Sequence, residues 1–331
     1  MPRYALLIAA STNRVYAGAA PGLTIAELTV FGPALTSPVD DVAITDIAGL
    51  PYVTFSADPA PEDLALLANL SAAYGLYELV GADGDELLRP VRLAPLARFD
   101  DDLITIPKYA GKTNEQFTRL LLNVTVLSSQ RGLGEPLTVL DPLCGRGTTL
   151  NQALMYGYSG IGIELDGKDV DAYSAFLRTY LQRKKIKHHT DMSPVRRERR
   201  TVARRFEAVI GDQTVTMFHG DTTQARDYLR ANCADVLVTD APYGVAHGSH
   251  AKGALARSPL ELLHAALPVW LELLRPGGAV GMSWNTHVAS RETVAGVFAQ
   301  YGLSVLDGPG YDALAHRVDQ AIHRDILVAT G

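Results

Sequence analysis

This 331-residue chain has few cysteines and no long apolar run. Its only two cysteines, Cys144 and Cys233, are too few for a disulfide framework or a cysteine-rich metal site, and they favour a reducing, cytoplasmic location. No stretch of 18 residues is free of charged or turn-forming residues, so no transmembrane helix is expected. The apolar start at residues 4–10 lacks a cleavage-type flank, and we interpret it as a buried first strand rather than a signal peptide.

The sequence also lacks internal repeats, low-complexity tracts and a metal-binding motif. Its histidines, like Cys144, are not spaced with cysteine or acidic partners in the way that metal ligands are. The histidines considered are His188, His189, His219, His247 and His250. We therefore expect no metal site.

Acidic residues predominate over the whole chain, but one segment is basic. The chain has 30 Lys and Arg against 36 Asp and Glu, for a net charge of -6. Residues 178–205 hold eleven of the basic residues and only two of the acidic ones. Such a concentration predicts contact with a polyanion, here the phosphates of a nucleic acid. The alternative is a solvated helix end and loop.

The first part of the chain has the strand and helix order of a ferredoxin-like module. Four strands and two helices are expected in the order βαββαβ. They are predicted at 4–10, 22–31, 42–45, 52–57, 61–70 and 75–80. Residues 1–84 are thus interpreted as an α+β ferredoxin-like domain, and residues 85–106, which are rich in Pro and Asp, as a linker.

From residue 107 to residue 331 strands and helices alternate, which predicts a doubly wound α/β domain of the Rossmann type. Strands are expected at 137–140, 158–165, 215–219, 236–239 and 279–283. Helices are expected at 148–156, 168–185, 223–230, 260–274 and 291–301. The last segments, 313–320 and 322–329, are expected to close the sheet as an antiparallel hairpin.

A glycine-containing turn between the first strand and helix of this domain is the candidate cofactor site. The sequence Asp141-Pro-Leu-Cys-Gly-Arg-Gly-Thr148 lets a ligand approach the backbone at a helix N-terminus. The next strand ends in Glu164 and Asp166, where dinucleotide folds place an acid on the ribose. There is no third glycine, and a carboxylate before the turn repels a pyrophosphate. S-adenosyl-L-methionine (SAM) has a sulfonium and an ammonium but no phosphate, so it fits better. A purely structural turn is the alternative.

Two further residues complete the predicted cofactor site. Asp221 ends another strand and is expected to accept from the adenine amine, or else to cap a helix. Lys112 lies in the segment 107–115, which is placed to cover the methionine end of SAM or else to start the following helix. The predicted contacts are Asp141, Cys144, Gly145, Gly147, Thr148, Glu164, Asp166, Asp221 and Lys112.

The run Asp240-Ala-Pro-Tyr-Gly244 follows an apolar strand and resembles the (D/N)PPY motif of class I SAM-dependent methyltransferases that modify exocyclic amines. Together with the turn at 141–149, it is most similar to the tRNA guanine N2-methyltransferases with a ferredoxin-like and THUMP front end. The resemblance covers residues 105–331 well and 1–80 loosely. This chain has Ala241 where the family has its first proline, and the interval 80–105 has no room for a complete THUMP domain.

The resemblance implies a catalytic role for Asp240, Ala241, Pro242 and Tyr243. The Asp240 carboxylate and the Ala241 carbonyl would accept both hydrogens of the amine and turn its lone pair toward the methyl group. Tyr243 would stack on the base, and Pro242 would complete the turn. The loop 245–258 would close over the substrate. The alternative is a strand-ending turn built from Asp and Pro.

These patterns predict a SAM-dependent N-methyltransferase that acts on a nucleobase amine, guanine N2 in tRNA being the best match. RNA is favoured over DNA because no sequence-reading insertion is evident, unless residues 183–214 serve as one. The alternatives are a DNA adenine or cytosine amino-methyltransferase, a SAM-binding regulatory RNA-binding protein without transfer activity, and an enzyme for a small-molecule or peptide amine.

Overall fold

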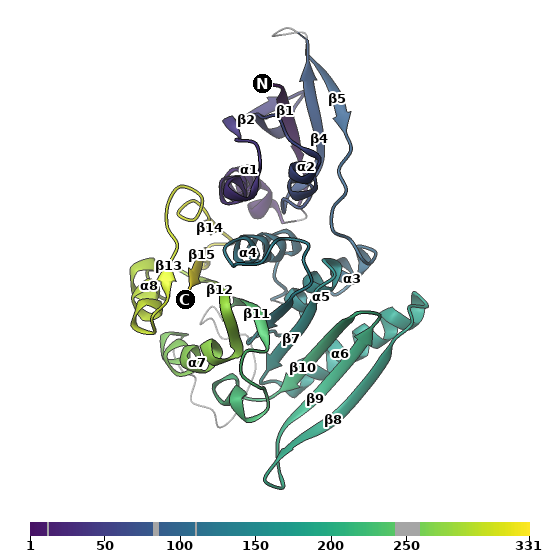
Figure 1. Cartoon of the computed structure of the whole chain (residues 1–331), viewed down its shortest axis with the longest axis vertical. Coiled ribbons are helices and arrows are strands. Elements are labelled where there is room, and N and C mark those ends of the chain that lie inside the picture. Colours follow the sequence, from purple (N-terminus) through teal and green to yellow (C-terminus); the bar gives the residue numbers. More distant parts are fainter. Residues whose placement is uncertain (12, 82–85, 110, 242–258) are drawn as a thin grey trace. The chain divides into compact units, whose positions relative to one another are not determined.

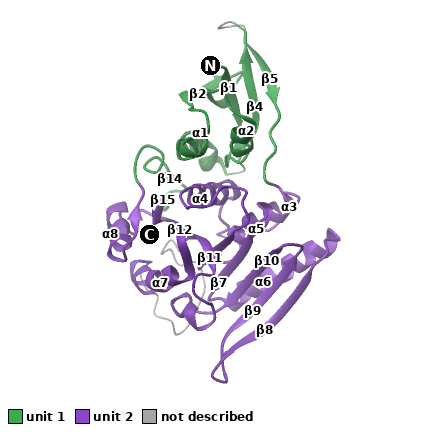
Figure 2. Cartoon of the chain, in the orientation of Figure 1, with its two compact units in different colours: residues 1–96, 307–325 green, residues 97–306, 326–331 purple. Residues whose placement is uncertain are grey.

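The computed structural model describes residues 1–11, 13–81, 86–109, 111–241 and 259–331. The chain divides into two compact units, shown in different colours in Figure 2. The first comprises residues 1–96 and 307–325, and the second comprises residues 97–306 and 326–331. No helix in the described ranges is both long enough and apolar enough to cross a membrane.

The first unit is an antiparallel sheet with two helices in the order that the sequence predicted. The elements are β1 (Arg3–Ile8), α1 (Arg14–Phe31), β2 (Asp40–Ile47), β3 (Leu50–Ser56), α2 (Pro61–Leu67) and β4 (Ala73–Val80). The strand order is β2-β3-β1-β4-β5. The fifth strand, β5 (Leu87–Val91), pairs with β4 and lies in the segment interpreted as a linker. That segment is therefore partly strand.

Helix α1 begins eight residues earlier than expected, because Asn13 caps it. The Asn13 Oδ1 accepts hydrogen bonds from the backbone N–H groups of Val15 and Tyr16, at 2.9 and 3.2 Å. Pro21 lies inside the helix rather than before it. The helix capped at Asn13 continues through Pro21 and Gly22.

The segment 307–325 belongs to the first unit, although the sequence assigned it to the second domain. Strand β14 (His316–Arg317) pairs with the start of β15 (His323–Thr330). The buried His316 ring meets the Tyr16 ring of α1 edge-on, with 5.7 Å between centroids. The predicted closing hairpin is present, and its side chains pack on a helix some 300 residues away in sequence.

The second unit contains a large mixed α/β sheet of the Rossmann-like type (Figure 1). Its strands are β6 (Thr138–Asp141), β7 (Ser159–Glu164), β8 (His189–Arg197), β9 (Arg200–Ile210), β10 (Gln213–His219), β11 (Ala234–Asp240), β12 (Leu274–Asn285), β13 (Ser304–Val305) and β15. Their order is β13-β15-β12-β11-β6-β7-β10-β9-β8. The neighbours from β10 to β12 through β7, β6 and β11 are parallel.

Helices connect these strands as the alternation predicted. They are α3 (Asp102–Thr105), α4 (Glu115–Leu127), α5 (Thr148–Met155), α6 (Gly167–Arg183), α7 (Pro259–Leu273) and α8 (Arg291–Gln300). The helix expected at 223–230 is a short 3-10 helix, η2 (Thr222–Asp227).

The β8–β9 hairpin was not predicted. A helix was expected at 168–185 and no strands at 186–205, whereas helix α6 ends at Arg183. Most of the remaining residues form the antiparallel strands β8 and β9, and β9 also pairs with β10 at the edge of the sheet. The turn between the strands uses Glu198 and Arg199 at φ 48° and 68°, as a tight hairpin requires.

Helix α4 lies very close to β12, and Gly281 makes this contact with no side chain. A Cβ atom at Gly281 would lie 1.7 Å from the Thr125 Oγ1 and 2.9 Å from its Cβ. Both residues are in the interior, where Thr125 is fully buried and its hydroxyl donates to the Leu121 carbonyl at 2.7 Å. Any larger residue at 281 has to displace the helix.

We expect Gly281→Ala to lower the free energy of unfolding by about 1–3 kcal/mol, the usual cost of overpacking a core. Gly18→Ala is the matched control, because Gly18 is exposed in helix α1 and a Cβ there meets nothing within 4 Å. It should leave stability unchanged or raise it slightly. Thermal melts followed by circular dichroism measure both. A Gly281→Ala protein that melts with the wild type would contradict the close packing.

Candidate cofactor and catalytic site

The carboxyl ends of the parallel strands bring the predicted site residues to one edge of the sheet. Asp141, Glu164 and Asp240 are the last residues of β6, β7 and β11. These strands are neighbours, or next neighbours, in parallel register. In open α/β sheets this edge is where ligands bind.

The glycine turn after β6 adopts the left-handed backbone that its sequence suggested. Gly145 and Gly147 have φ of 50° and 75°, and Gly147 immediately precedes α5. A Cβ at Gly147 would lie 2.4 Å from the buried ring of Tyr173. Both the backbone conformation and the space at Gly147 therefore require glycine.

Cys144 contributes packing and backbone to this turn. Its side chain is buried, and a Cβ at Gly162 on β7 would lie 2.7 Å from its Sγ. Its N–H donates to the Ile163 carbonyl at 3.0 Å. Burial raises the pKa of the Cys144 thiol well above its usual value, so the thiol stays protonated.

The carboxylate of Glu164 joins the glycine turn to the end of β7. It accepts from the Gly145 N–H at 3.0 Å and from the Asp166 N–H at 2.7 Å. Burial raises the pKa of this carboxyl, although the backbone hydrogen bonds that it accepts act in the opposite direction. The structure thus places Glu164 beside the turn, as expected for a residue that shares a ligand with it.

Two of the predicted acids cap helices. The Asp166 carboxylate accepts from the Lys168 N–H at 2.8 Å at the start of α6. The Asp221 Oδ1 accepts from the N–H and the hydroxyl of Thr223, at 2.9 and 2.8 Å. The capping alternative for Asp221 is therefore present in the structure. The preceding Gly220 N–H donates to the Glu164 carbonyl at 3.0 Å, which keeps this turn next to β7.

Asp141 is buried behind the glycine turn. Its Oδ1 accepts from the Leu143 N–H at 3.2 Å and from the Thr239 hydroxyl at 3.0 Å. Burial, with a smaller contribution from the nearby Asp240, raises the pKa of Asp141 to about 7. The described contacts of this carboxyl thus hold the turn together.

Asp240 is held by hydroxyl groups from two distant parts of the chain. The Thr113 hydroxyl donates to Oδ2 at 2.8 Å, and the Ser283 hydroxyl donates to Oδ1. The Ala241 N–H donates to the Ser283 carbonyl at 2.8 Å, which anchors the start of the motif. Pro242, Tyr243 and the loop 245–258 lie outside the described residues.

Sequence reasoning did not identify Thr113 and Ser283. Thr113 lies in the segment 107–115, which was expected near the cofactor but had no motif of its own. Ser283 ends the strand predicted at 279–283 and pairs in parallel register with Asp240. The only feature of the sequence that points to Ser283 is its place at the end of a predicted strand, as Asp240 is at the end of another.

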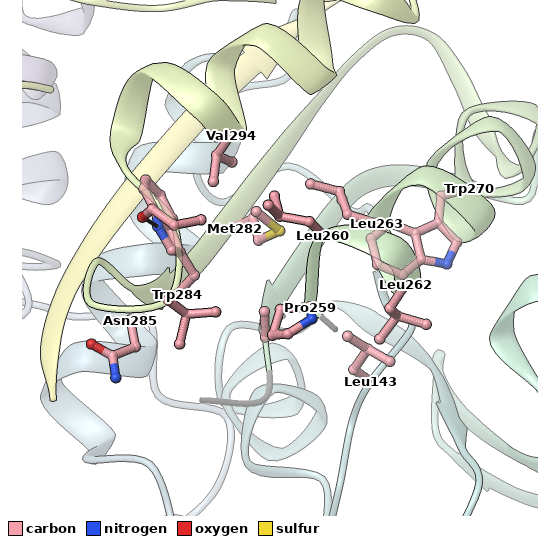
Figure 3. Close-up of a pocket in the computed structure, with 13 residues that line it drawn as sticks. Leu143, Pro259, Leu260, Leu262, Leu263, Trp270, Met282, Trp284, Asn285 and Val294 are labelled. Atoms are coloured by element: carbon pink, nitrogen blue, oxygen red, sulfur yellow. Dashed lines mark hydrogen bonds between the residues drawn. The ribbon is translucent and has the colours of Figure 1, made fainter. Parts of the chain in front are cut away.

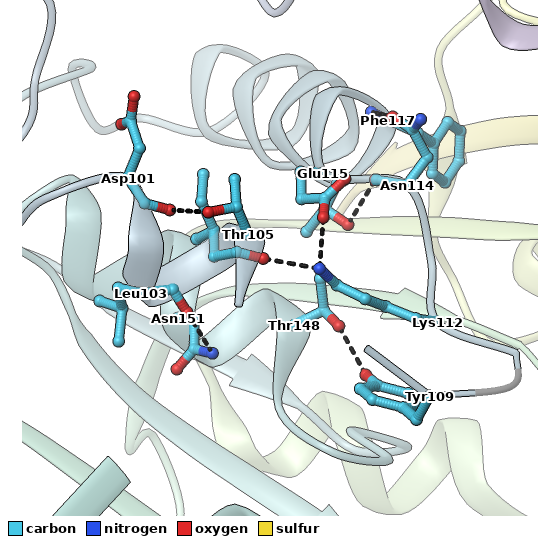
Figure 4. A network of polar contacts seen from close by, with 12 residues as sticks. Asp101, Leu103, Thr105, Tyr109, Lys112, Asn114, Glu115, Phe117, Thr148 and Asn151 are labelled. Carbon is cyan, nitrogen blue, oxygen red and sulfur yellow. Dashed lines mark hydrogen bonds and ion pairs between the residues drawn. The ribbon is translucent and has the colours of Figure 1, made fainter. Parts of the chain in front are cut away.

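The Lys112 side chain is bound by other residues of the protein and does not extend into solvent. Its amino group donates to the Ile104 carbonyl at 2.6 Å and pairs with the Glu115 carboxylate, and its side chain is 12% exposed (Figure 4). The residue of this segment that contacts the glycine turn is Tyr109, whose hydroxyl is 2.9 Å from the Thr148 Oγ1. Lys112 therefore fixes the start of α4, and its contact with a cofactor remains a prediction.

A small apolar pocket lies beside Ala241, the residue that follows Asp240 (Figure 3). Its walls come from the glycine turn, the end of β11, the end of β12, helix α7 and the start of α8. The lining residues used below are Leu143, Ala241, Met282, Trp284 and Asn285. Trp284 is buried, and its indole N–H donates to the Ala289 carbonyl at 2.9 Å. Trp284 is thus both a core residue and a wall of the pocket.

Within the described ranges, no group of three or more His, Cys, Asp and Glu side chains could hold a metal ion. The acids at the sheet edge are bonded to backbone N–H groups and hydroxyls instead. The arrangement therefore offers hydrogen-bond acceptors beside a glycine turn, which suits an organic ligand with hydroxyl or amino groups.

No protein-family model matches the chain, and no curated protein sequence is similar to it. TrmN from Thermus thermophilus is similar in structure over 100% of this chain and 99% of its own, with 13% identity and a TM-score of 0.48. A methyltransferase from Pyrococcus furiosus is similar over 67% of this chain and 86% of its own, with 14% identity and a TM-score of 0.41. An rRNA methylase from Streptococcus thermophilus covers 60% and 88%, with 11% identity and a TM-score of 0.34.

The raised pKa of Asp141 predicts a pH-dependent stability. Below pH 3.8 this carboxyl is protonated in both the folded and the unfolded state and costs no stability. Between pH 3.8 and about 7 the unfolded state loses the proton while the folded state keeps it, so the free energy of unfolding falls as the pH rises. Asp141→Asn keeps an acceptor oxygen and removes the charge. The melting temperature of the variant, relative to the wild type, should therefore rise from about pH 4 to about pH 7 and level off at higher pH. A difference that stays constant over this range would show that Asp141 is not neutralised by burial.

Proposed function

We propose that this protein is a SAM-dependent methyltransferase that modifies an exocyclic amine of a nucleobase in RNA. The observation that carries the proposal is the position of Asp240. Its carboxylate stands at the carboxyl end of β11, oriented by Thr113 and Ser283, on the same sheet edge as the glycine turn and Glu164. This is the arrangement in which an amine held by Asp240 and a cofactor held by the turn meet.

The residues at the edge fit SAM, which supplies an electrophilic methyl group on a sulfonium. The left-handed turn at Gly145 and Gly147 leaves room for the ligand to approach the backbone. Glu164 would accept hydrogen bonds from the ribose hydroxyls, because its carboxylate lies beside the glycine turn. Asp221, on the next strand end, would accept from the adenine amine through the oxygen that does not cap η2. SAM has no phosphate, so the acids at the edge would meet no pyrophosphate charge.

Asp240 would prepare the amine without acting as a strong base. An aromatic amine is a poor nucleophile because its lone pair is delocalised into the ring. The Asp240 carboxylate accepts the Thr113 and Ser283 hydroxyls and would also accept one N–H of the substrate amine. The Ala241 carbonyl would accept the second hydrogen, and the bond from the Ala241 N–H to Ser283 fixes the peptide that precedes it. The amine lone pair then points at the methyl group, and positioning provides the rate.

The pocket beside Ala241 would receive the base. Its Leu143, Met282 and Trp284 walls are apolar, and the amide of Asn285 is the polar group among the residues that line it. A flat aromatic ring matches such walls better than a peptide amine does. Guanine N2 in tRNA is the substrate that the likeness of residues 141–149 and 240–244 to the N2-methyltransferases supports.

Asp240→Ala should reduce methyl transfer by at least about a hundredfold, because the amine is no longer oriented. SAM affinity should stay within a few-fold of the wild type, since Asp240 is proposed to hold only the amine. Asp240→Asn should retain part of the activity, because its amide oxygen still accepts one hydrogen bond. Transfer from labelled SAM to total RNA and to DNA, beside calorimetric SAM binding, measures these effects. Wild-type transfer by Asp240→Ala would refute the proposed function.

Glu164→Ala should weaken SAM binding by about 1.5–3 kcal/mol, the usual worth of a hydrogen bond to a charged group. Asp221→Ala should weaken it less, because the adenine amine is neutral and the Asp221 Oδ1 is occupied by the cap. Calorimetric titration of both folded variants with SAM provides the comparison. Equal affinities for Glu164→Ala and the wild type would remove Glu164 from the cofactor site.

A further inference from the structure

The outer part of the β8–β9 hairpin is a free two-stranded ribbon. Strand β10 pairs with β9 only from Ile210 to Arg204. Beyond that point the residues pair with one another alone, with Val195 opposite Ala203, Arg196 opposite Thr201 and Arg197 opposite Arg200. Residues 195–203 therefore form an arm that extends past the sheet, as the long hairpin in Figure 1 shows.

This ribbon leaves the sheet at the edge that carries the proposed active site. Arg204 is opposite His219, the last residue of β10, and His219 is opposite Glu164, the last residue of β7. Since β9 runs antiparallel to these strands, the residues before Arg204 lie beyond their carboxyl ends. Four strand spacings separate β9 from β11, which places the ribbon about 19 Å from the strand of Asp240. A ligand larger than one nucleotide can reach both.

The tip of the ribbon carries three arginines without ion pairs. Arg197 pairs with Asp227, and Arg204 pairs with Asp171, at 2.5 and 2.8 Å, while Arg205 lies within 4 Å of Asp191 and Glu207. Arg196, Arg199 and Arg200 are exposed and have no acidic partner in the described part of the chain.

The composition of the ribbon distinguishes between two kinds of nucleic acid. Residues 186–205 contain no Phe, Tyr or Trp, whereas proteins that bind single strands use aromatic platforms on which the bases stack. Double-helical RNA is recognised through its phosphates and 2′-hydroxyls, without access to the base faces. Arginines on a β-ribbon without aromatics suit the second mode.

We propose that the arginine tip, defined as Arg196, Arg199 and Arg200, binds the phosphates of a double-helical segment of the RNA substrate. The inference rests on the proposed function, because it takes the target base at Asp240 and the helix at the ribbon to belong to one RNA. The target base lies outside the stack, as enzymes that act on bases require, and the adjoining helix is held by the arginine tip.

The test is a comparison of two triple variants with equal charge loss. Arg196, Arg199 and Arg200 are changed to Gln in the first, and Arg183, Lys185 and Lys187 are changed to Gln in the second. The second set is also exposed, but it lies at the end of helix α6 and just after it, at the opposite edge of the sheet. Fluorescence anisotropy without SAM measures binding to an RNA hairpin, to an unstructured RNA of equal length, and to the hairpin's DNA counterpart over a range of salt. Calorimetric SAM binding verifies that both variants fold.

The tip variant should lose at least about tenfold in affinity for the RNA hairpin, and its log–log salt slope should fall by about two to three, from about 0.9 per lost phosphate contact. The control variant should bind the hairpin like the wild type. Equal losses for the two variants, equal losses for hairpin and unstructured RNA, wild-type binding to DNA as tight as to RNA, or no loss at all would each overturn the inference.

The outcomes also separate this inference from the proposed function. A tip variant that binds RNA like the wild type while Asp240→Ala abolishes transfer removes the arginine tip and keeps the methyltransferase. Loss of hairpin binding in the tip variant, together with full transfer by Asp240→Ala, supports an RNA-binding ribbon on a protein whose chemistry is different.

Discussion

The fixed carboxylate of Asp240 is the constraint on which the rest of the candidate site depends. Thr113 approaches it from the segment before α4, and Ser283 approaches from the end of β12. A free aspartate side chain rotates between several conformers, and a group that must orient a substrate amine has to be restricted to one. The two hydroxyls bind two different oxygens of the carboxylate and so provide that restriction.

The same edge of the sheet concentrates acids whose charge is costly. Asp141 and Glu164 both have pKa values raised by burial, and hydrogen bonds from backbone N–H groups and hydroxyls partly offset that cost. These bonds also connect the glycine turn to β7 and β11. The carboxylates therefore maintain the geometry of the turn, and a cation at this edge would relieve the mutual repulsion of Asp141 and Asp240. A sulfonium ligand is consistent with such an edge, and a phosphate ligand is not.

Charge is distributed unevenly in the second unit for a physical reason. Most acids near the basic segment are used to hold it in place, as Asp100 and Asp102 do for Lys184 and Asp171 does for Arg204. Exposed ion pairs of this kind contribute little stability, so their main effect is on position. Arg196, Arg199 and Arg200, which have no acidic partner in the described part of the chain, are at the tip of the ribbon, where a polyanion is accessible to them.

The sequence by itself determined the features that depend on local chemistry. The α/β alternation, the left-handed turn at Gly145 and Gly147, and the acid at the end of β7 follow from periodicity and from the backbone freedom of glycine. Only the tertiary structure decided the rest. Sheet register brought Ser283 to Asp240, packing on α1 moved residues 307–325 into the first unit, and pairing with β10 made a β-ribbon of a basic segment that reads as a loop. Each of these depends on partners far away in the chain, which no local pattern specifies.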